Sequence, residues 1–146
     1  MTHPVSAILL IAGSFNVVNG YHVVETSMQW AAASAYCSDT FGSTLATFTT
    51  DAEASELRAL MDASADTRFW NGLNDIASEG TWVFESGYDC GGNCDIITQW
   101  NSGEPNDANG EDCAEFWASG TTFNINDLSC SKSRSFICDD VVTTTS

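Results

Sequence analysis

The sequence predicts an α+β fold, because helical periodicity in its first half gives way to strand patterns in its second half. Apolar residues recur at helical spacing twice between Trp30 and Met61. From Phe69 onward, short aromatic and β-branched runs alternate with polar connections, which is typical of strands. With 146 residues, 43% of them hydrophobic, the chain is long enough for one domain with a real core.

Residues 1–19 are predicted to precede the domain, which spans residues 20–140. Val5–Ala12 is an apolar run with the length of a signal-peptide core, too short to span a bilayer. A signal peptide implies a secreted, extracellular protein. Because Lys and Arg are absent before this run, a buried first strand stays the alternative. Residues 141–146 form a Thr-rich tail with little to anchor it.

The first half of the domain is predicted as a strand followed by two helices. Gly20–Glu25 has the content of a strand that should pair late in the sequence. Thr26–Gln29 fits a capping box for a helix that ends at Gly42 and buries Trp30, Ala33, Cys37 and Phe41. Thr50–Glu53 is a second capping box, before a helix whose apolar face carries Leu57, Leu60 and Met61.

The second half is predicted to consist of strands and one long loop. The expected strands are Phe69–Leu73, Gly80–Phe84, Cys113–Trp117, Thr122–Asn126 and Ser135–Asp139. Glu85–Asp112 is rich in Gly, Asn, Asp and Ser, and a loop of this length in a compact domain is usually functional or disordered. We interpret four tryptophans as core or loop-packing residues: Trp70, Trp82, Trp100 and Trp117.

The charge balance argues against some partners. The formal net charge is −16, from 20 acidic and four basic residues, which opposes binding to nucleic acid or to an anionic membrane surface. No membrane insertion is expected either. Eleven of the acids lie between Asp75 and Asp127, so a divalent cation bound there would relieve their repulsion.

Six cysteines without zinc-type spacing predict three disulfides and an oxidising compartment. Cys90 and Cys94 flank the flexible segment Gly91–Asn93 and could close a local loop. The pattern alone does not select among the fifteen possible pairings.

Residues 104–127 carry the strongest functional signal, because their polar groups suit calcium. Glu104–Asp107, Glu111–Asp112 and Asn126–Asp127 supply carboxylate and amide oxygens, with no Lys, Arg or His among them. Pro105 is the residue type that makes a cis peptide bond accessible, and a tight turn there would aim Glu104 and Asn106 the same way. Carboxylates accept and amides donate hydrogen bonds, so a vicinal diol could satisfy both its hydroxyls at such a metal.

In this order, the motifs resemble the C-type lectin domain over about residues 20–140. The resemblance rests on Trp30 with Cys37, Phe69–Leu73 followed by Gly80–Trp82, Glu104–Asn106, Glu111–Cys113, Asn126–Asp127 and Phe136–Cys138. It implies a C-type lectin-like fold, with two helices packed on small antiparallel sheets and a long calcium-binding loop. It also implies the disulfides Cys37–Cys138 and Cys113–Cys130, which leaves Cys90–Cys94 by elimination.

The resemblance further implies two calcium sites. The sugar-binding calcium would be held by Glu104, Asn106, Glu111, Asn126 and Asp127, which would also bind the carbohydrate. A second calcium would be held by Asp75, Glu79, Asp107 and Asp112. The Glu-Pro-Asn order resembles family members that bind mannose, fucose, glucose or N-acetylglucosamine, whereas galactose binders usually carry Gln-Pro-Asp. A shallow site of this kind binds one sugar weakly, so a homo-oligomer would supply avidity.

Two other functions compete with that of a lectin. An enzyme is not expected, because the histidines are only His3 and His22, and His22 is interpreted as a surface strand residue. Metal-bound carboxylates such as Glu104 and Glu111 would be poor proton donors. The alternative within the same fold is a domain that binds a protein or an ice surface rather than sugar. Loss of the calcium ligands is its usual sign, and here all five for the sugar site are present.

Overall fold

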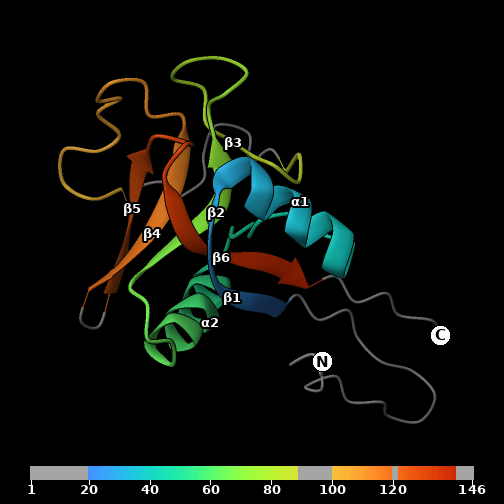
Figure 1. Ribbon diagram of the computed structural model, residues 1–146. Helices are drawn as coiled ribbons and strands as arrows, with labels where there is room; N and C mark the ends of the chain where they lie inside the picture. Colours follow the sequence, from blue (N-terminus) through green and yellow to red (C-terminus); the bar gives the residue numbers. More distant parts are fainter. Residues whose placement is uncertain (1–19, 89–99, 120–121, 141–146) are drawn as a thin grey trace, which may run out of the picture.

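The computed structural model describes residues 20–88, 100–119 and 122–140 (Figure 1). The predicted signal peptide (residues 1–19), the predicted Cys90–Cys94 pair and the tail 141–146 lie outside the described residues. The elements are β1 Gly20–Gln29, α1 Trp30–Phe41, α2 Asp51–Asp62, β2 Arg68–Asn74, β3 Val83–Phe84, β4 Cys113–Ser119, β5 Thr122–Leu128 and β6 Ser133–Asp140. Two helices and a set of strands confirm the predicted α+β class.

The strands of the described part form one six-stranded sheet in the order β1-β6-β2-β4-β5, with β3 paired to β2. Strand β1 pairs with β6, as in the register Val24↔Phe136, so the prediction that the first strand pairs late in the sequence is confirmed. Antiparallel sheets were expected, and four of the strand pairs in the described part are antiparallel, whereas β2 and β6 are parallel. The sheet is therefore mixed, because β6 returns between β1 and β2 and joins their pairings.

The two helices cover opposite faces of this sheet. Trp30 of α1 packs in a cluster with Trp70 and Phe136. Leu57 of α2 packs in a second cluster with Phe69 and Ile137, which adjoin Trp70 and Phe136 in the same two strands. Successive strand residues point to opposite faces, so α1 and α2 lie on different sides, as Figure 1 shows.

The start of α1 differs from the prediction. Thr26–Gln29 is not a capping box, because β1 continues to Gln29, which pairs with Ser133. The N-cap is Gln29, and its side chain makes no capping hydrogen bond. Instead, the Trp30 N–H donates to the Cys130 carbonyl at 3.2 Å. The backbone pairing of β1 with β6 therefore prevents Thr26–Gln29 from forming the capping box that the local sequence predicts.

The other helix boundaries follow the prediction. Gly42 ends α1 in the left-handed conformation, with φ of 66°. Thr50 caps α2, since its hydroxyl accepts from the Glu53 N–H at 3.1 Å. The Glu53 carboxylate accepts in return from the Thr49 N–H at 2.9 Å, one residue earlier than in the usual capping box.

Two side chains, those of His22 and Trp117, lie elsewhere than predicted. His22 is buried rather than on the surface: its ring stacks on Phe41 at 3.9 Å, and its Nε2 lies 2.9 Å from Asp140 Oδ1. Trp117 is 37% exposed and is not a core residue. The other three tryptophans are confirmed as core or loop-packing residues: Trp70 is fully buried, and Trp82 and Trp100 pack against the core.

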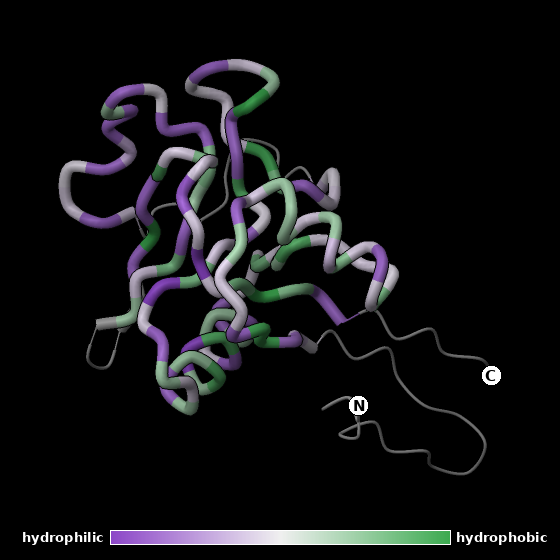
Figure 2. Tube along the Cα trace, in the orientation of Figure 1, coloured by the Kyte–Doolittle hydropathy of each residue, from purple (hydrophilic) through white to green (hydrophobic). Residues whose placement is uncertain are grey.

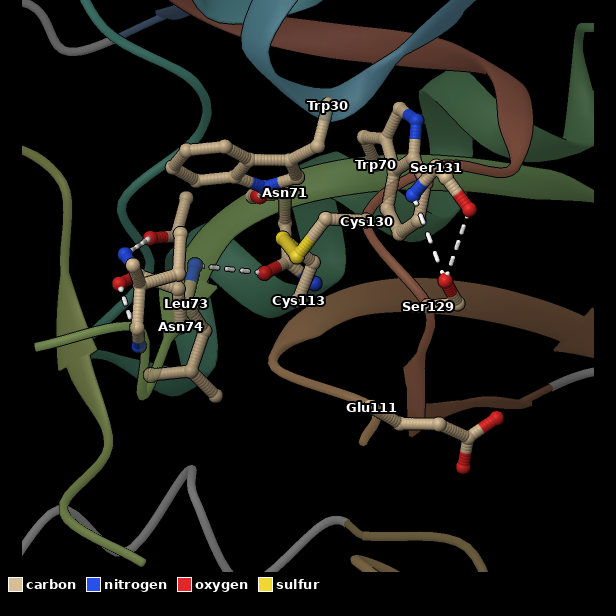
Figure 3. The surroundings of a disulfide bond; sticks show 12 residues. Trp30, Trp70, Asn71, Leu73, Asn74, Glu111, Cys113, Ser129, Cys130 and Ser131 are labelled. Atoms are coloured by element: carbon tan, nitrogen blue, oxygen red, sulfur yellow. Dashed lines mark hydrogen bonds between the residues drawn. A yellow bond between two sulfur atoms is a disulfide. The ribbon is translucent and has the colours of Figure 1, made fainter. Parts of the chain in front are cut away.

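Two disulfides confirm the pairings that the resemblance implied. Cys37–Cys138 joins α1 to β6, and Cys113–Cys130 joins the start of β4 to the turn after β5. Figure 3 shows the second bond close to Trp30, Trp70 and Asn71. Closing a loop of about 100 residues removes roughly 4–5 kcal/mol of chain entropy from the unfolded state in the polymer description.

Gly72 is required where β2 passes the segment after α1. A Cβ at Gly72 would lie 2.8 Å from the Leu45 carbonyl oxygen, and the Gly72 N–H already donates to the Ala46 carbonyl at 3.0 Å. Gly72→Ala should therefore lower the free energy of unfolding by about 3 kcal/mol, as expected for overpacking. Urea denaturation measures this. Gly20→Ala is the control, since its Cβ would meet nothing closer than 3.6 Å; equal losses would contradict the close approach.

Asp139 gives the stability a defined pH dependence. Burial raises the pKa of Asp139 to about 6, against hydrogen bonds from Thr47 and Thr44 that lower the pKa. The folded state therefore holds this proton between about pH 4 and 6 when the unfolded chain has lost it, so the free energy of unfolding falls as pH rises through that window. Asp139→Asn should remove this fall, which amounts to about 3 kcal/mol for a pKa difference of about two units.

Urea titrations at several pH values measure the effect. The control is Asp39→Asn on the exposed side of α1, which should leave the slope unchanged. An Asp139→Asn protein with the wild-type slope would show that this carboxyl does not carry the dependence.

Candidate functional site

The turn at Pro105 is fastened to β5 through one carboxylate. Asp127 is fully buried, and its two oxygens accept from the backbone N–H groups of Asn106 at 3.1 Å and Asp107 at 2.7 Å. The Glu104–Pro105 bond is cis, as predicted. Asp127 therefore fixes the backbone from which Glu104 and Asn106 project.

A first acidic cluster forms around this turn. Carboxylate oxygens of Glu104, Glu111 and Asp127 lie within 4.8 Å of one another. These residues come from the turn, from the segment before β4 and from β5. Register pairs Cys113 of β4 with Leu128 of β5, which brings the start of one strand beside the end of the other. Three of the five residues predicted for the sugar-site calcium are thus brought together.

The two asparagines of the predicted set lie beside this cluster. Asn106 donates from Nδ2 to Glu104 Oε2 at 3.3 Å, and its Oδ1 accepts from the Ala108 N–H at 3.0 Å. Asn126 donates from Nδ2 to Glu115 Oε2 at 2.9 Å. Both amide groups are therefore oriented by neighbours within the chain.

A second acidic cluster brings together three of the four residues predicted for the second calcium. Carboxylate oxygens of Asp75, Glu79 and Asp112 lie within 4.8 Å of one another. The Gly80 N–H donates to Asp75 Oδ2 at 2.8 Å, and the Asp75 N–H donates to the Asp112 carbonyl at 3.0 Å. Asp107 lies near enough for its charge to act on Glu79, and its own Oδ1 accepts from the Glu111 N–H at 2.9 Å.

Burial, contacts between carboxyl groups and their mutual repulsion together raise pKa values in both clusters. In the first, burial and the neighbouring Asp127 raise the pKa of Glu104 to about 7, and burial with the same charge raises the pKa of Glu111. In the second, a hydrogen bond to Asp75 is the main cause that raises the pKa of Glu79 to about 7, and burial raises the pKa of Asp112. A cation would offset this repulsion.

Both clusters also hold buried oxygens without a hydrogen-bond partner. These atoms are Glu104 Oε1 in the first cluster, and Asp75 Oδ1 and Asp112 Oδ1 in the second. A buried carboxylate oxygen without a donor is costly. Carboxylate and amide oxygens without nitrogen or sulfur ligands form the donor set of a hard cation such as Ca²⁺. The residues present therefore fit the metal that the resemblance implied.

The surrounding loop has the matching polarity. Figure 2 shows the segment 100–112, at the upper left, as largely hydrophilic, whereas green apolar stretches lie along the strands and helices. Figure 3 places Glu111 on the chain that leads into Cys113 and its disulfide. The crosslink thus anchors the chain directly behind one candidate ligand.

Sequence reasoning missed Glu115, which is fully buried beside the first cluster. It accepts from Arg134 Nε at 2.7 Å, Arg68 Nη1 at 3.0 Å and Asn126 Nδ2 at 2.9 Å. The available signal was a lone charge in the apolar strand Cys113–Trp117. A charge at such a position needs partners, and the chain has only four basic residues to supply them.

Comparison with known proteins identifies the family. Residues 26–140 match the Lectin C-type domain, and the chain belongs to that family. It is 34% identical over 123 residues to CD209 antigen-like protein D of Mus musculus, covering 84% of this chain and 48% of that protein. It is 31% identical over 122 residues to C-type lectin 37Db of Drosophila melanogaster, covering 81% and 75%. The chain thus spans about half of the mouse relative's length.

Solved structures support the fold. Human lithostathine superposes with a TM-score of 0.75 at 23% identity, covering 91% of this chain and 100% of that one. A calcium-independent type II antifreeze protein superposes with a TM-score of 0.68 at 23% identity, covering 93% and 98%. At this identity the likeness concerns the fold alone. In the described part of the chain, neither helix is long and apolar enough to cross a bilayer.

Proposed function

We propose that the protein is a calcium-dependent lectin that binds mannose-type glycans through neighbouring equatorial hydroxyls. The observation that carries this proposal is the cluster of Glu104, Glu111 and Asp127, with a buried Glu104 oxygen that lacks a hydrogen-bond partner. Within a C-type lectin domain, this cluster contains three of the residues that the resemblance assigns to the sugar-binding calcium. Bound there, calcium would supply open coordination positions to two sugar oxygens.

The chain's own residues would orient the sugar around that ion. Carboxylates of Glu104 and Glu111 accept hydrogen bonds from hydroxyl groups, and the amides of Asn106 and Asn126 donate them. Glu104 and Asn106 lie side by side, with Asn106 Nδ2 at 3.3 Å from Glu104 Oε2. Acceptors and donors therefore alternate, which suits two adjacent hydroxyls that each donate once and accept once.

The order of these two residues supports the proposed preference. Glu104 places an acceptor, and Asn106 a donor, on the two sides of Pro105. Exchanging the two positions would exchange the hydrogen-bond pattern offered to a diol. The Glu-Pro-Asn order resembles that of mannose-type members, and we therefore propose glycans with mannose, fucose or N-acetylglucosamine.

The second cluster is proposed as an auxiliary calcium site held by Asp75, Glu79, Asp107 and Asp112. Two of these residues leave buried oxygens without partners, and Asp112 adjoins Glu111 of the first cluster in sequence. The hydrogen bond to Asp75 is the main cause that raises the pKa of Glu79, and repulsion from Asp107 and Asp75 adds to it. A cation there would offset that repulsion. It would thus favour the loop arrangement that the first site needs.

The remaining properties follow from this proposal. We propose that the protein is secreted, assembles as a homo-oligomer for avidity and catalyses no reaction. His22, the histidine within the described residues, is buried against Phe41 and Asp140 and belongs to β1, not to the acidic clusters. Nucleic acid and anionic membrane surfaces are not expected partners at a net charge of −16.

Calcium should be required for sugar binding. Calorimetric titration of metal-free protein with Ca²⁺ should show uptake, and a glycan array should show mannose-type binding that EDTA abolishes. Glu111→Gln should weaken calcium and glycan binding together, whereas the surface control Asp39→Asn should leave both unchanged. Absence of calcium uptake by the correctly oxidised protein would refute the proposal. Glycan binding unaffected by EDTA would refute it equally, and an array without binding would favour a protein or ice ligand.

Exchanging the acceptor and donor around Pro105 should change the preferred sugar. Glu104→Gln combined with Asn106→Asp should lower affinity for mannose and raise affinity for galactose, by about tenfold in relative terms. Competition with free monosaccharides in saturating calcium measures this ratio. A variant that binds calcium and keeps the wild-type preference would show that these two residues do not set the hydrogen-bond pattern.

A further inference from the structure

The sequence contains three Asn-Gly steps, of which two lie wholly within the described residues. They are Asn71–Gly72 in β2 and Asn109–Gly110 in the segment before β4. Asparagine is chemically labile before glycine, because glycine has no side chain to keep its backbone nitrogen away from the asparagine amide carbon. Both steps have the same chemistry, so their surroundings in the fold decide which of them reacts.

The sheet protects the first step. Asn71 is fully buried, and its Oδ1 accepts from the Leu73 N–H at 2.8 Å. The Gly72 N–H donates to the Ala46 carbonyl at 3.0 Å, in the close passage described above. A reaction between the Gly72 nitrogen and the Asn71 side chain would require β2 to leave its neighbours. This step is therefore expected to react only in the unfolded chain.

Asn109–Gly110 has the opposite surroundings. Both residues are exposed, and both have positive φ, 58° and 79°, as in a tight turn. Apart from its chain neighbours, no described group lies within 4 Å of the position that a Cβ would take on Gly110. The Gly110 N–H donates to the Asp107 carbonyl at 3.2 Å, within the turn itself. This bond can open locally without disturbing the sheet, so the Gly110 nitrogen can reach the Asn109 side chain.

The same turn connects the two acidic clusters. Asp107 Oδ1 accepts from the Glu111 N–H at 2.9 Å, which closes the chain over residues 108–110. Glu111 belongs to the first cluster, and Asp107 is one of the residues proposed for the second calcium. The Asp107 N–H also donates to Asp127 Oδ2 at 2.7 Å. A closure over so few residues leaves no slack for an additional main-chain atom.

We propose that Asn109 is a site of spontaneous deamidation, and that its conversion to isoaspartate weakens the calcium sites. The Gly110 nitrogen loses its proton to base and attacks Asn109 Cγ, which closes a succinimide ring. The bond from Cγ to the side-chain nitrogen breaks, and ammonia leaves with a proton from solvent. Water then opens the ring: attack at the main-chain carbonyl leaves isoaspartate, and attack at Cγ leaves aspartate. One water is consumed and one ammonia released, without an oxidant or reductant.

The main product changes the length of the backbone. In isoaspartate the chain runs through the former side chain, which adds a carbon to the main chain between Asp107 and Glu111. The Asp107–Glu111 hydrogen bond is then lost, and the Glu111 carboxylate is no longer fixed relative to Glu104 and Asp127. The new carboxylate also adds negative charge to an acidic loop. This consequence rests on the calcium sites proposed above, whereas the modification itself does not.

Peptide mapping after incubation in metal-free, mildly alkaline buffer tests the modification. Cleavage before aspartate gives peptide 107–111, in which Asn109 is the sole asparagine, and peptide 66–74, which carries Asn71. Mass spectrometry should find deamidation in 107–111 of the folded protein and none at Asn71. Both sites should react in a reduced chain unfolded in guanidinium. An unchanged Asn109, or equal conversion at Asn71 in the folded protein, would overturn the proposal.

Calorimetric titration with Ca²⁺ tests the consequence. The isoaspartate form, separated by ion exchange, should bind calcium about tenfold more weakly than fresh protein, as expected when a contact that orients a ligand is lost. Asn109→Gly suits the positive φ and lacks the amide, so its affinity should survive the same incubation. Asn109→Asp adds the charge without the extra main-chain atom, so it should lose less affinity than the isoaspartate form.

The possible results separate this inference from the proposed function. If fresh protein takes up calcium and the isoaspartate form binds it equally well, the proposed effect of Asn109 is overturned and the calcium sites stand. A loss in Asn109→Asp as large as that of the isoaspartate form would overturn the explanation by backbone length. If fresh protein takes up no calcium, the proposed function is overturned, whereas deamidation at Asn109 is still measured by mass.

Discussion

The binding region depends on the two hydrogen bonds that the carboxylate of Asp127 accepts. This buried carboxylate receives the N–H groups of Asn106 and Asp107 and so fixes a loop turn to a sheet strand. Hydrogen bonds of this type to an ionised group are the strong ones. Without them, Glu104 would project from a polar loop with no defined relation to Glu111. The same carboxylate also belongs to the acidic cluster, so one group both builds the site and would share in holding its cation.

The acidic clusters impose a cost that the rest of the domain offsets. Carboxylates within 4.8 Å of one another repel, and buried oxygens without partners add to that cost. Strand pairing, the Cys113–Cys130 bond and the buried pairing of Trp30 Nε1 with the Asn71 carbonyl at 2.9 Å hold the surrounding backbone in place. Strain concentrated at a site and offset elsewhere is common where a protein binds ions or ligands.

Local sequence patterns predicted some elements well and failed where long-range pairing decided the outcome. Thr50 caps its helix as the sequence indicated, because the whole motif lies within four residues. Thr26 did not, because β6 recruited the same residues into a ladder. His22 and Trp117 were both misplaced, since the side of a strand that faces the core depends on its neighbours in the sheet. Glu115 was missed because its partners, Arg68 and Arg134, are distant in sequence.

The sequence by itself determined the α+β class, the cysteine pairs Cys37–Cys138 and Cys113–Cys130 through the family resemblance, and the residue types suited to calcium. Those properties reside in composition, spacing and motif order. Only the tertiary structure decided which acids meet: Asp75 joins Asp112, and Glu104 joins Asp127. It also decided that Trp117 faces solvent over Arg68. The reason is physical, because proximity between residues 20 to 40 positions apart is set by strand register and loop closure, which no local pattern encodes.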